Sequence, residues 1–238
     1  MDIRAVKERL TEAGATWLEA ARVDVLGHPT AISHYFAAVS RRCGRAPLRA
    51  DDPQGLVHGT IDDAARGVLL GALTLRGVER VDLLDDLYHH GDAGEKRGIL
   101  RGLHVLGASE EPIGPALLPL VEDALRTNDV RLIAAALQEY GAQHLGQEAY
   151  RQAIVKFVFT GIPLHAVRNL AERQDAELAR MLVDLAHERA AAGRGIPADI
   201  PPVVAAFPEC LDRPDLPVAL LSALLPAISR DPLYRDPL

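Results

Sequence analysis

Apolar residues recur every three or four positions along most of the chain, and this spacing is typical of amphipathic helices. In the segment 92–106, Ile99, Leu100 and Leu103 fall on one stripe of a helical wheel. Gly, Pro, Asn or Asp interrupts the pattern often, and no segment shows the alternation that is typical of strands. The pattern predicts helices at 3–13, 15–26, 30–43, 61–75, 79–89, 92–106, 113–126, 129–142, 147–159, 163–171, 175–192 and 217–229.

Short helices joined by tight turns favour antiparallel helix pairs. We therefore predict an all-α fold, in which antiparallel pairs stack as an irregular HEAT-like α-solenoid. Three regions are expected: an N-terminal helical arm with a long loop at 1–60, a stacked helical-pair core at 61–192, and a Pro-rich C-terminal cap at 193–238. The loop at 44–60 contains two prolines and three glycines, so we interpret it as a lid or a linker.

If the helices run alternately up and down, every second turn lies on the same edge of the stack. Three polar turns, at 88–92, 126–129 and 160–163, fall on one edge by this rule. We expect this edge to contact a ligand or a partner protein. The candidate residues are His89, His90, Asp92, Glu95, Lys96, Asn128, Asp129 and Thr160.

Helix capping is the competing interpretation of the acidic and amide residues on this edge. Asp92 and Asn128 stand where N-caps are expected, and Glu95 follows Asp92 at the capping-box distance. Capping does not explain Lys96, which lies close to the apolar stripe of its helix. A buried ammonium needs a partner, so Lys96 should reach a carboxylate such as Asp129, contact an anionic ligand, or extend to solvent.

Composition and charge narrow the function classes. The net charge of −7 and the absence of a lysine cluster argue against nucleic-acid binding, including a HEAT-like DNA glycosylase. No apolar run is long enough to span a bilayer, so membrane insertion is not expected. Cys43 and Cys210 are far apart and no secretory leader is present, which favours a reducing, cytoplasmic location.

Recognised cofactor and nucleophile motifs are absent from the sequence. It contains no G-x-S-x-G, no phosphate loop, no strand-led G-x-G-x-x-G and no C-x-x-C, so no cofactor is expected. His89 and His90 are adjacent on a helix and point about 100° apart, which disfavours joint metal chelation. We predict neither a metal site nor an identifiable catalytic residue.

Several ordered segments between residues 82 and 199 resemble the EboA domain family. They are LYHHGDAGEKRGILRGL, ALRTNDVRL, AYRQAIVKFVFTGIPL and DAELARMLVDLAHERAAAGRGIPADI. The resemblance implies a bacterial, helical, cytoplasmic protein encoded in clusters that assemble or export specialised metabolites. It transfers no catalytic residues.

Two hypotheses follow. The first is a non-catalytic helical adaptor or metabolite-binding protein, whose partner is a protein from the same gene cluster or a small anionic metabolite. The alternative is an enzyme that uses a histidine and a carboxylate in a helical cleft on a small polar or prenylated metabolite. The enzyme would need His89 or His90 within hydrogen-bond reach of Asp92, Asp129 or Glu139.

Overall fold

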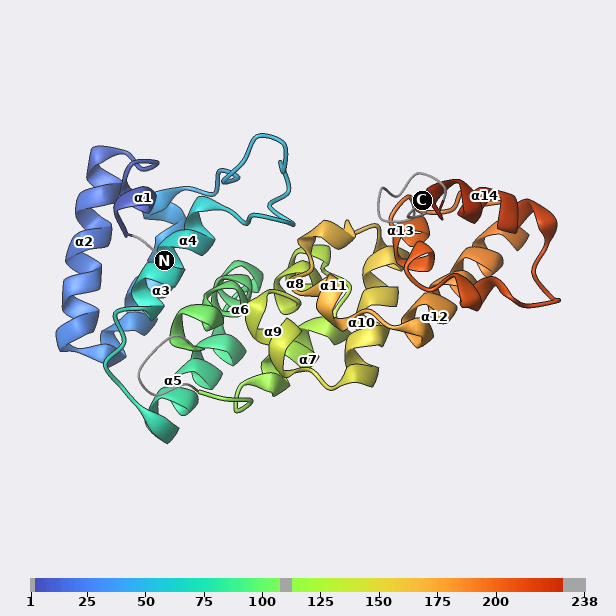
Figure 1. Ribbon diagram of the computed structural model, residues 1–238. Helices are drawn as coiled ribbons and strands as arrows, with labels where there is room; N and C mark the ends of the chain where they lie inside the picture. The colour runs from blue at the N-terminus through green and yellow to red at the C-terminus, as the bar shows by residue number, and fades with distance from the viewer. Residues whose placement is uncertain (1–2, 108–112, 229–238) are drawn as a thin grey trace, which may run out of the picture. The chain divides into compact units, whose positions relative to one another are not determined.

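A computed structural model describes residues 3–107 and 113–228 of the chain (Figure 1). Within these ranges every regular element is an α-helix or a short 3₁₀ helix, and no strand is present. The predicted all-α class is therefore confirmed. The described residues form two compact units, one of Met1–Leu145 with His165–Arg168, the other of Gly146–Leu164 with Asn169–Leu238.

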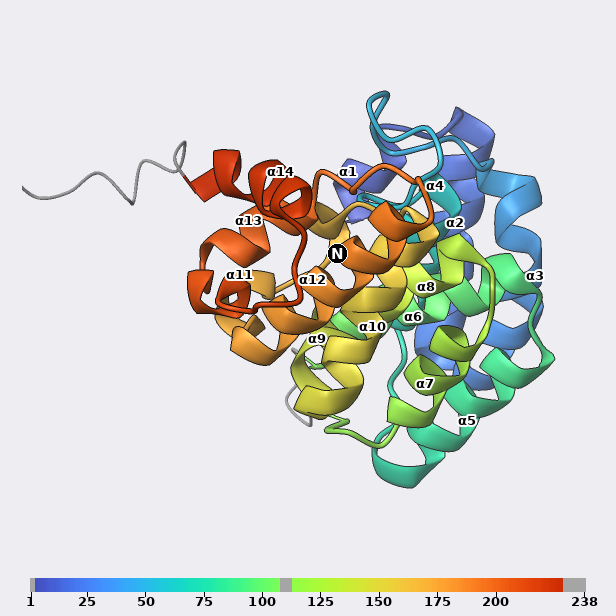
Figure 2. The same cartoon turned by 90° about the vertical axis from the view of Figure 1, so that its right-hand side faces the viewer.

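The first unit contains the helices that precede residue 145. In Figures 1 and 2, α2 and α3 lie side by side at its N-terminal end. The helices are α1 (Ile3–Lys7), α2 (Glu12–Gly27), a 3₁₀ turn (Pro29–Ala31), α3 (Ile32–Cys43), α4 (Ile61–Leu70), α5 (Gly77–His90), α6 (Ala93–Gly107), α7 (Leu118–Arg126), α8 (Val130–Ala136) and α9 (Glu139–His144).

The second unit is built around α12, which packs against α10 and α13, while α13 also packs against α14. Its core contains Leu178, Leu182, Ile200 and Leu220, all of which are buried. The helices are α10 (Gln147–Thr160), α11 (Leu170–Arg173), α12 (Ala176–Ala191), α13 (Ile200–Ala205), a 3₁₀ turn (Pro208–Leu211) and α14 (Val218–Ile228).

Helix α4 lies at the centre of the first unit, and all ten of its residues are buried. It packs most extensively against α6. Glycines on α6 allow this approach: a Cβ at Gly98 would lie 2.4 Å from Cδ of Arg66, and one at Gly102 would lie 2.4 Å from Cδ1 of Leu70. This helix also carries Asp62, so the core of the first unit contains a buried carboxylate as well as apolar side chains.

The predicted helix at 129–142 is wrong, because it consists of two helices, α8 and α9. The chain turns at Gln138, which has an extended backbone and whose side-chain amide donates to the carbonyls of Ala134 and Ala166. The turn brings Gly141 onto the carbonyl of Ala136, where a Cβ would lie only 1.8 Å from the oxygen. A single continuous helix cannot make this approach.

Two further differences have local causes. The first predicted helix, 3–13, ends at Lys7, because the Thr11 hydroxyl accepts a hydrogen bond from the Gly14 amide and starts α2 instead. No bounds were predicted for helix α13, because the sequence indicated only short helices in the Pro-rich segment 193–217. Prolines are tolerated in the first turn of a helix, which is where Pro201 and Pro202 stand. Residue 229, the last of the predicted helix 217–229, lies outside the described residues.

The loop at 44–60 has no helix, as predicted, and it is fixed to the first unit at several points. The guanidinium of Arg101 donates to the carbonyls of residues 55–57, at 2.7 to 3.3 Å. The carboxylate of Asp52 accepts from the amides of residues 56–58. Both side chains are buried. The loop is therefore an ordered part of the first unit.

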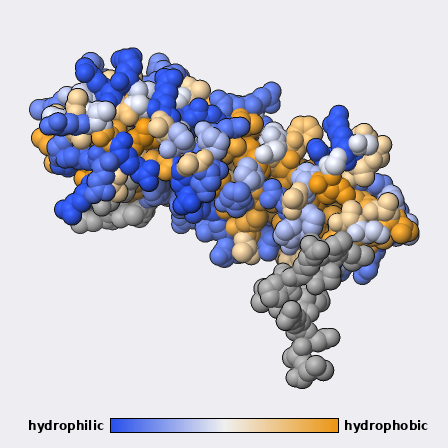
Figure 3. Space-filling view, turned by 90° about the horizontal axis from the view of Figure 1, so that it is seen from above, coloured by the Kyte–Doolittle hydropathy of each residue, from blue (hydrophilic) through white to orange (hydrophobic). Residues whose placement is uncertain are grey.

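The face of the molecule seen in Figure 3 carries hydrophilic side chains with smaller hydrophobic areas between them. Among the described residues, the exposed large apolar side chains are Val23 and Leu26 on α2, Val78 on α5, Phe159 on α10 and Val218 on α14. In the described part of the chain, none of the helices combines the length and the apolar character needed to cross a bilayer.

Candidate functional site

A polar pocket of about 300 Å³ lies in the first unit, where the N-terminal ends of α4, α6 and α8 meet the segment that follows α3. Two of the three predicted polar turns, at 88–92 and 126–129, contribute to it. The lining residues are Arg45, Asp62, Asp92, Ala93, Gly94, Arg97, Asp129 and Arg131. We call this cavity the polar pocket.

A buried ion network lies beneath the polar pocket. Arg97, only 4% exposed, donates from Nε to both carboxylate oxygens of Asp63, at 2.7 and 2.9 Å. Asp62, 1% exposed, accepts from Nη1 of Arg66 at 3.0 Å and from the Ser40 hydroxyl at 2.9 Å. Nη2 of Arg97 lies 3.5 Å from Asp62 and joins the two pairs. Such a network fixes the guanidinium of Arg97 at the wall of the pocket.

The carboxyl group of Asp62 stays ionised in this network. Burial alone would raise its pKa, because it disfavours the charged form. The hydrogen bond from Thr60, the charges of Arg97 and Arg66 and the hydrogen bond from Ser40 together outweigh burial and lower the pKa below its usual value. Asp62 therefore balances the arginines and has no acceptor capacity left for a ligand.

The two other carboxylates of the pocket cap helices, each through one oxygen. Oδ1 of Asp92 accepts from the Glu95 amide, and Glu95 accepts in return from the Asp92 amide, both at 2.8 Å. This is the predicted capping box. Oδ1 of Asp129 accepts from the amides of Arg131 and Leu132. Asp129, and not Asn128 as predicted, is the N-cap of α8.

Hydrogen-bond donors remain free in the polar pocket. Nε of Arg131 is buried and has no hydrogen-bond partner among the described residues. Ala93 and Gly94 open α6, so their amides have no acceptor within the helix. Arg45 is exposed, and the hydrogen bond from the Ile61 amide to the Ala46 carbonyl, 2.9 Å long, holds its segment beside α4.

Lys96 does not reach Asp129. Its ammonium lies 4.8 Å from the centre of the Tyr88 ring, so the aromatic face takes the place of the expected carboxylate. Tyr88 itself is fully buried and donates its hydroxyl to Asp123 at 3.1 Å. Of the three expected roles of Lys96, the contact with Asp129 is not formed, and the anionic ligand stays a prediction.

The two predicted histidines are exposed and contact their own helix. Nε2 of His89 lies 3.6 Å from Asp85, and Nδ1 of His90 lies 2.9 Å from the carbonyl of Asp86. In the described structure, neither ring is within hydrogen-bond reach of Asp92 or of the other predicted carboxylates. The expected pairing of His89 or His90 with Asp92, Asp129 or Glu139 is therefore not formed among the described residues, whereas Nδ1 of His104 lies 4.0 Å from Glu139.

The remaining candidates do not line the polar pocket. Glu95 is engaged in the capping box, and Asn128 is exposed at the start of α8. Thr160 belongs to the second unit, where its hydroxyl donates to the carbonyl of Lys156 at 2.8 Å and closes the end of α10.

Sequence reasoning did not identify the arginines of the pocket. Arg97 and Arg131 lie on helices that carry several other charged residues. The spacing of apolar residues does not show which of these charged side chains point into the protein. One signal was present: Thr60 and Asp63 have capping-box spacing, and the structure forms this box at the start of α4. Two acidic residues in an otherwise apolar helix indicate that basic partners are buried beside them.

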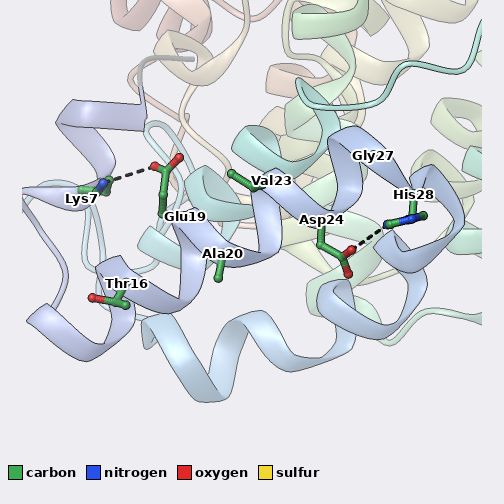
Figure 4. Close-up of a pocket in the computed structure, with 8 residues that line it drawn as sticks. All are labelled: Lys7, Thr16, Glu19, Ala20, Val23, Asp24, Gly27 and His28. Atoms are coloured by element: carbon green, nitrogen blue, oxygen red, sulfur yellow. Dashed lines mark hydrogen bonds and ion pairs between the residues drawn. The ribbon is translucent and has the colours of Figure 1, made fainter.

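A wider groove of about 730 Å³ follows the outer face of α2, and Figure 4 shows the side chains that line it. Its charged groups satisfy one another. Glu19 pairs with Lys7 at 3.2 Å, and Asp24 pairs with His28 at 2.9 Å. The charged groups of the groove are thus already paired with one another, and we place the candidate site at the polar pocket.

Neither thiol is suited to nucleophilic chemistry. Burial raises the pKa of Cys43 and of Cys210 to about 11, so both stay protonated at neutral pH. Within the described ranges, no three His, Cys, Asp or Glu side chains are grouped so that they could hold a metal ion.

Comparison with known proteins shows which family the chain matches. The model of the family described as "Metabolite traffic protein EboA" matches residues 3–205 of the chain, which include the first unit from residue 3 onward. No curated protein and no solved structure matches the chain.

Proposed function

We propose that this chain, which belongs to the EboA family of metabolite traffic proteins, binds a small anionic metabolite in the polar pocket without transforming it. In this role it would act as a non-catalytic carrier or adaptor in a bacterial specialised-metabolite cluster. The metabolite would be received from, or passed to, proteins of the same cluster. The helix pairs would stack in the HEAT-like manner that the sequence predicts.

The observation that carries the proposal is the group of hydrogen-bond donors in the pocket that have no acceptor. Among the described residues Arg131 has a buried nitrogen without a partner. Arg45 lines the same cavity, and so do Ala93 and Gly94, whose amides have no acceptor within α6. Helix N-termini and guanidiniums both favour anions. The Asp62 carboxylate, by contrast, is already saturated. An anion would satisfy the donors that the protein leaves open.

The enzymatic alternative has less support. No histidine lines the pocket in the described structure, because His89 and His90 are exposed and contact their own helix. Binding without chemistry is also what a protein of metabolite traffic would need.

Isothermal titration calorimetry with inorganic phosphate tests the proposal. We expect Arg131→Gln and Arg45→Gln each to weaken binding by about tenfold or more, because each removes a charge-assisted contact. Arg126→Gln is the matched control, since Arg126 pairs with Asp123 on the surface nearby. The proposal fails if folded wild-type protein binds neither phosphate nor small carboxylates, or if all three variants bind equally.

A further inference from the structure

We infer that the metabolite is a small hydroxylated anion, such as a polyol or sugar that carries one phosphate or carboxylate. This inference rests on the proposed function and specifies its ligand. It excludes the aromatic and prenylated compounds that an anion site could otherwise accept.

The lining of the polar pocket gives the first reason. Of its eight residues, six are charged and the other two are Ala93 and Gly94. No branched aliphatic or aromatic side chain is among them. Binding of an aromatic or prenyl group depends on burying apolar area against apolar walls. Among the described residues no such side chain lines this pocket, which favours a ligand whose body is itself polar.

The second reason lies in the helix-capping carboxylates. Asp92 and Asp129 each bind backbone amides through Oδ1. In neither case does Oδ2 have a hydrogen-bond partner among the described residues. A carboxylate oxygen accepts but cannot donate. The pocket therefore presents two free acceptors beside its free donors, and hydroxyl groups are the donors that a small metabolite most readily supplies.

The charge of the pocket gives the third reason. Three guanidiniums, of Arg45, Arg97 and Arg131, stand against three carboxylates. A ligand with negative charge at both ends would meet the carboxylates of Asp92 and Asp129. A neutral hydroxylated body avoids this repulsion. An ammonium body would instead be attracted by the same two carboxylates, and the competition below distinguishes it from a hydroxylated one.

The geometry thus assigns two parts to the site. The anionic group lies at Arg131, Arg45 and the first amides of α6. The hydroxyl groups lie at Oδ2 of Asp92 and Asp129. Arg97 supports the wall between them, because the buried ion network holds its side chain in place.

Calorimetric competition among four probes tests the inference. The probes are glycerol 3-phosphate, ethyl phosphate, phosphoethanolamine and glycerol. We expect glycerol 3-phosphate to bind about tenfold or more tightly than ethyl phosphate, because hydrogen bonds to charged acceptors are strong. Phosphoethanolamine should bind less tightly than glycerol 3-phosphate, because it offers one ammonium where glycerol 3-phosphate offers two hydroxyl groups, and glycerol alone should not bind measurably.

Asp129→Asn and Asp92→Asn supply the matched variants. Asparagine is as good an N-cap as aspartate, so α8 and α6 keep their starts while the free acceptor becomes a donor. Each variant should lose most of the preference for glycerol 3-phosphate over ethyl phosphate while it still binds ethyl phosphate. Glu122→Gln, an exposed carboxylate on α7, should leave the preference unchanged.

The outcomes separate the two proposals. If no phosphate compound binds, the proposed function itself fails. If ethyl phosphate and glycerol 3-phosphate bind equally, or if the asparagine variants keep the preference, the anion site stands and the hydroxyl inference is overturned. Tighter binding of phosphoethanolamine than of glycerol 3-phosphate would also overturn it.

Discussion

At the scale of single residues, Asp175 has a structural role in the second unit. It is the N-cap of α12, accepting from the Leu178 amide at 2.9 Å, and it forms a bidentate pair with Arg151. The hydrogen bond from Arg151 is the largest of the causes that lower its pKa, from 3.8 to about 2. One carboxylate thus joins the start of α12 to α10.

Asp175→Asn should reduce the acid sensitivity of the protein. A lowered pKa stabilises the folded state above the unfolded value of 3.8, and this contribution is lost as the pH falls toward 2. The side chain is a third exposed, so we discount the full shift for solvent screening and expect a loss of about 1 kcal/mol at pH 6. Urea unfolding of wild type and Asp175→Asn at pH 6, 4 and 2 measures this difference in the free energy of unfolding.

The result has a clear contrary outcome. The difference in the free energy of unfolding between wild type and Asp175→Asn should shrink as the pH falls from 4 to 2. A constant difference over this range would show that the Arg151 pair contributes nothing through the charge of Asp175. Asparagine keeps the cap, so loss of capping does not confuse the comparison.

Residue roles set by local spacing could be predicted from the sequence, and roles set by tertiary contacts could not. The Asp92–Glu95 capping box depends on three residues of spacing and was predicted correctly. The partner of Lys96 depends on the neighbouring helix, and it is Tyr88 rather than Asp129. The functional role of the candidate residues stays a prediction.

At the scale of elements, the contact between α4 and α6 depends on glycine. Gly98→Ala should destabilise the first unit by about 1 to 3 kcal/mol, because the new methyl group would overlap the stem of the buried Arg66. Thermal unfolding measures the effect. Gly27→Ala is the control: nothing lies within 4 Å of its Cβ position at the end of α2, and alanine favours a helix. Equal stability of the two variants would contradict the close contact.

Element boundaries were predicted well where caps decide them and poorly where close packing decides them. Helix α6 was expected at 92–106 and is found at Ala93–Gly107. The break between α8 and α9 arises because Gly141 packs on the carbonyl of Ala136. The helical spacing of apolar residues continues without interruption through residues 129–142, so the sequence pattern does not indicate this break.

At the scale of the whole molecule, each unit has its own buried core. Leu220→Ala, on α14, should destabilise the second unit by about 2 to 4 kcal/mol, because Leu220 is 2% exposed. Relative to wild type, Leu220→Ala should increase the rate of amide hydrogen exchange more in α12 and α13 than in α4 and α6. Val218→Ala is the control, since Val218 is 78% exposed. Equal acceleration in both units would contradict separate cores.

The all-α class could be predicted from the sequence because helical periodicity is local and repeated many times. The family also became visible there, through ordered segments that the match to residues 3–205 bears out. The polar pocket could be located only in part. The up-and-down argument placed the turns of Asp92 and Asp129 on one edge, but Arg45 and Arg97 reach the pocket through the 44–60 loop and the buried ion network.

The anchoring of the 44–60 loop by Arg101 and Asp52 has a kinetic consequence. Arg45 stands at the rim of the polar pocket on a stretch that is already paired with the segment leading into α4, through the Pro47–Thr60 bridge. If the pocket binds an anion as we propose, the ligand meets a backbone segment that needs no ordering step. Binding should then be a single, second-order event that proceeds near the diffusion limit and slows with added salt. Differences in affinity between ligands would then arise mainly from the dissociation rate, which sets the residence time of the bound ligand.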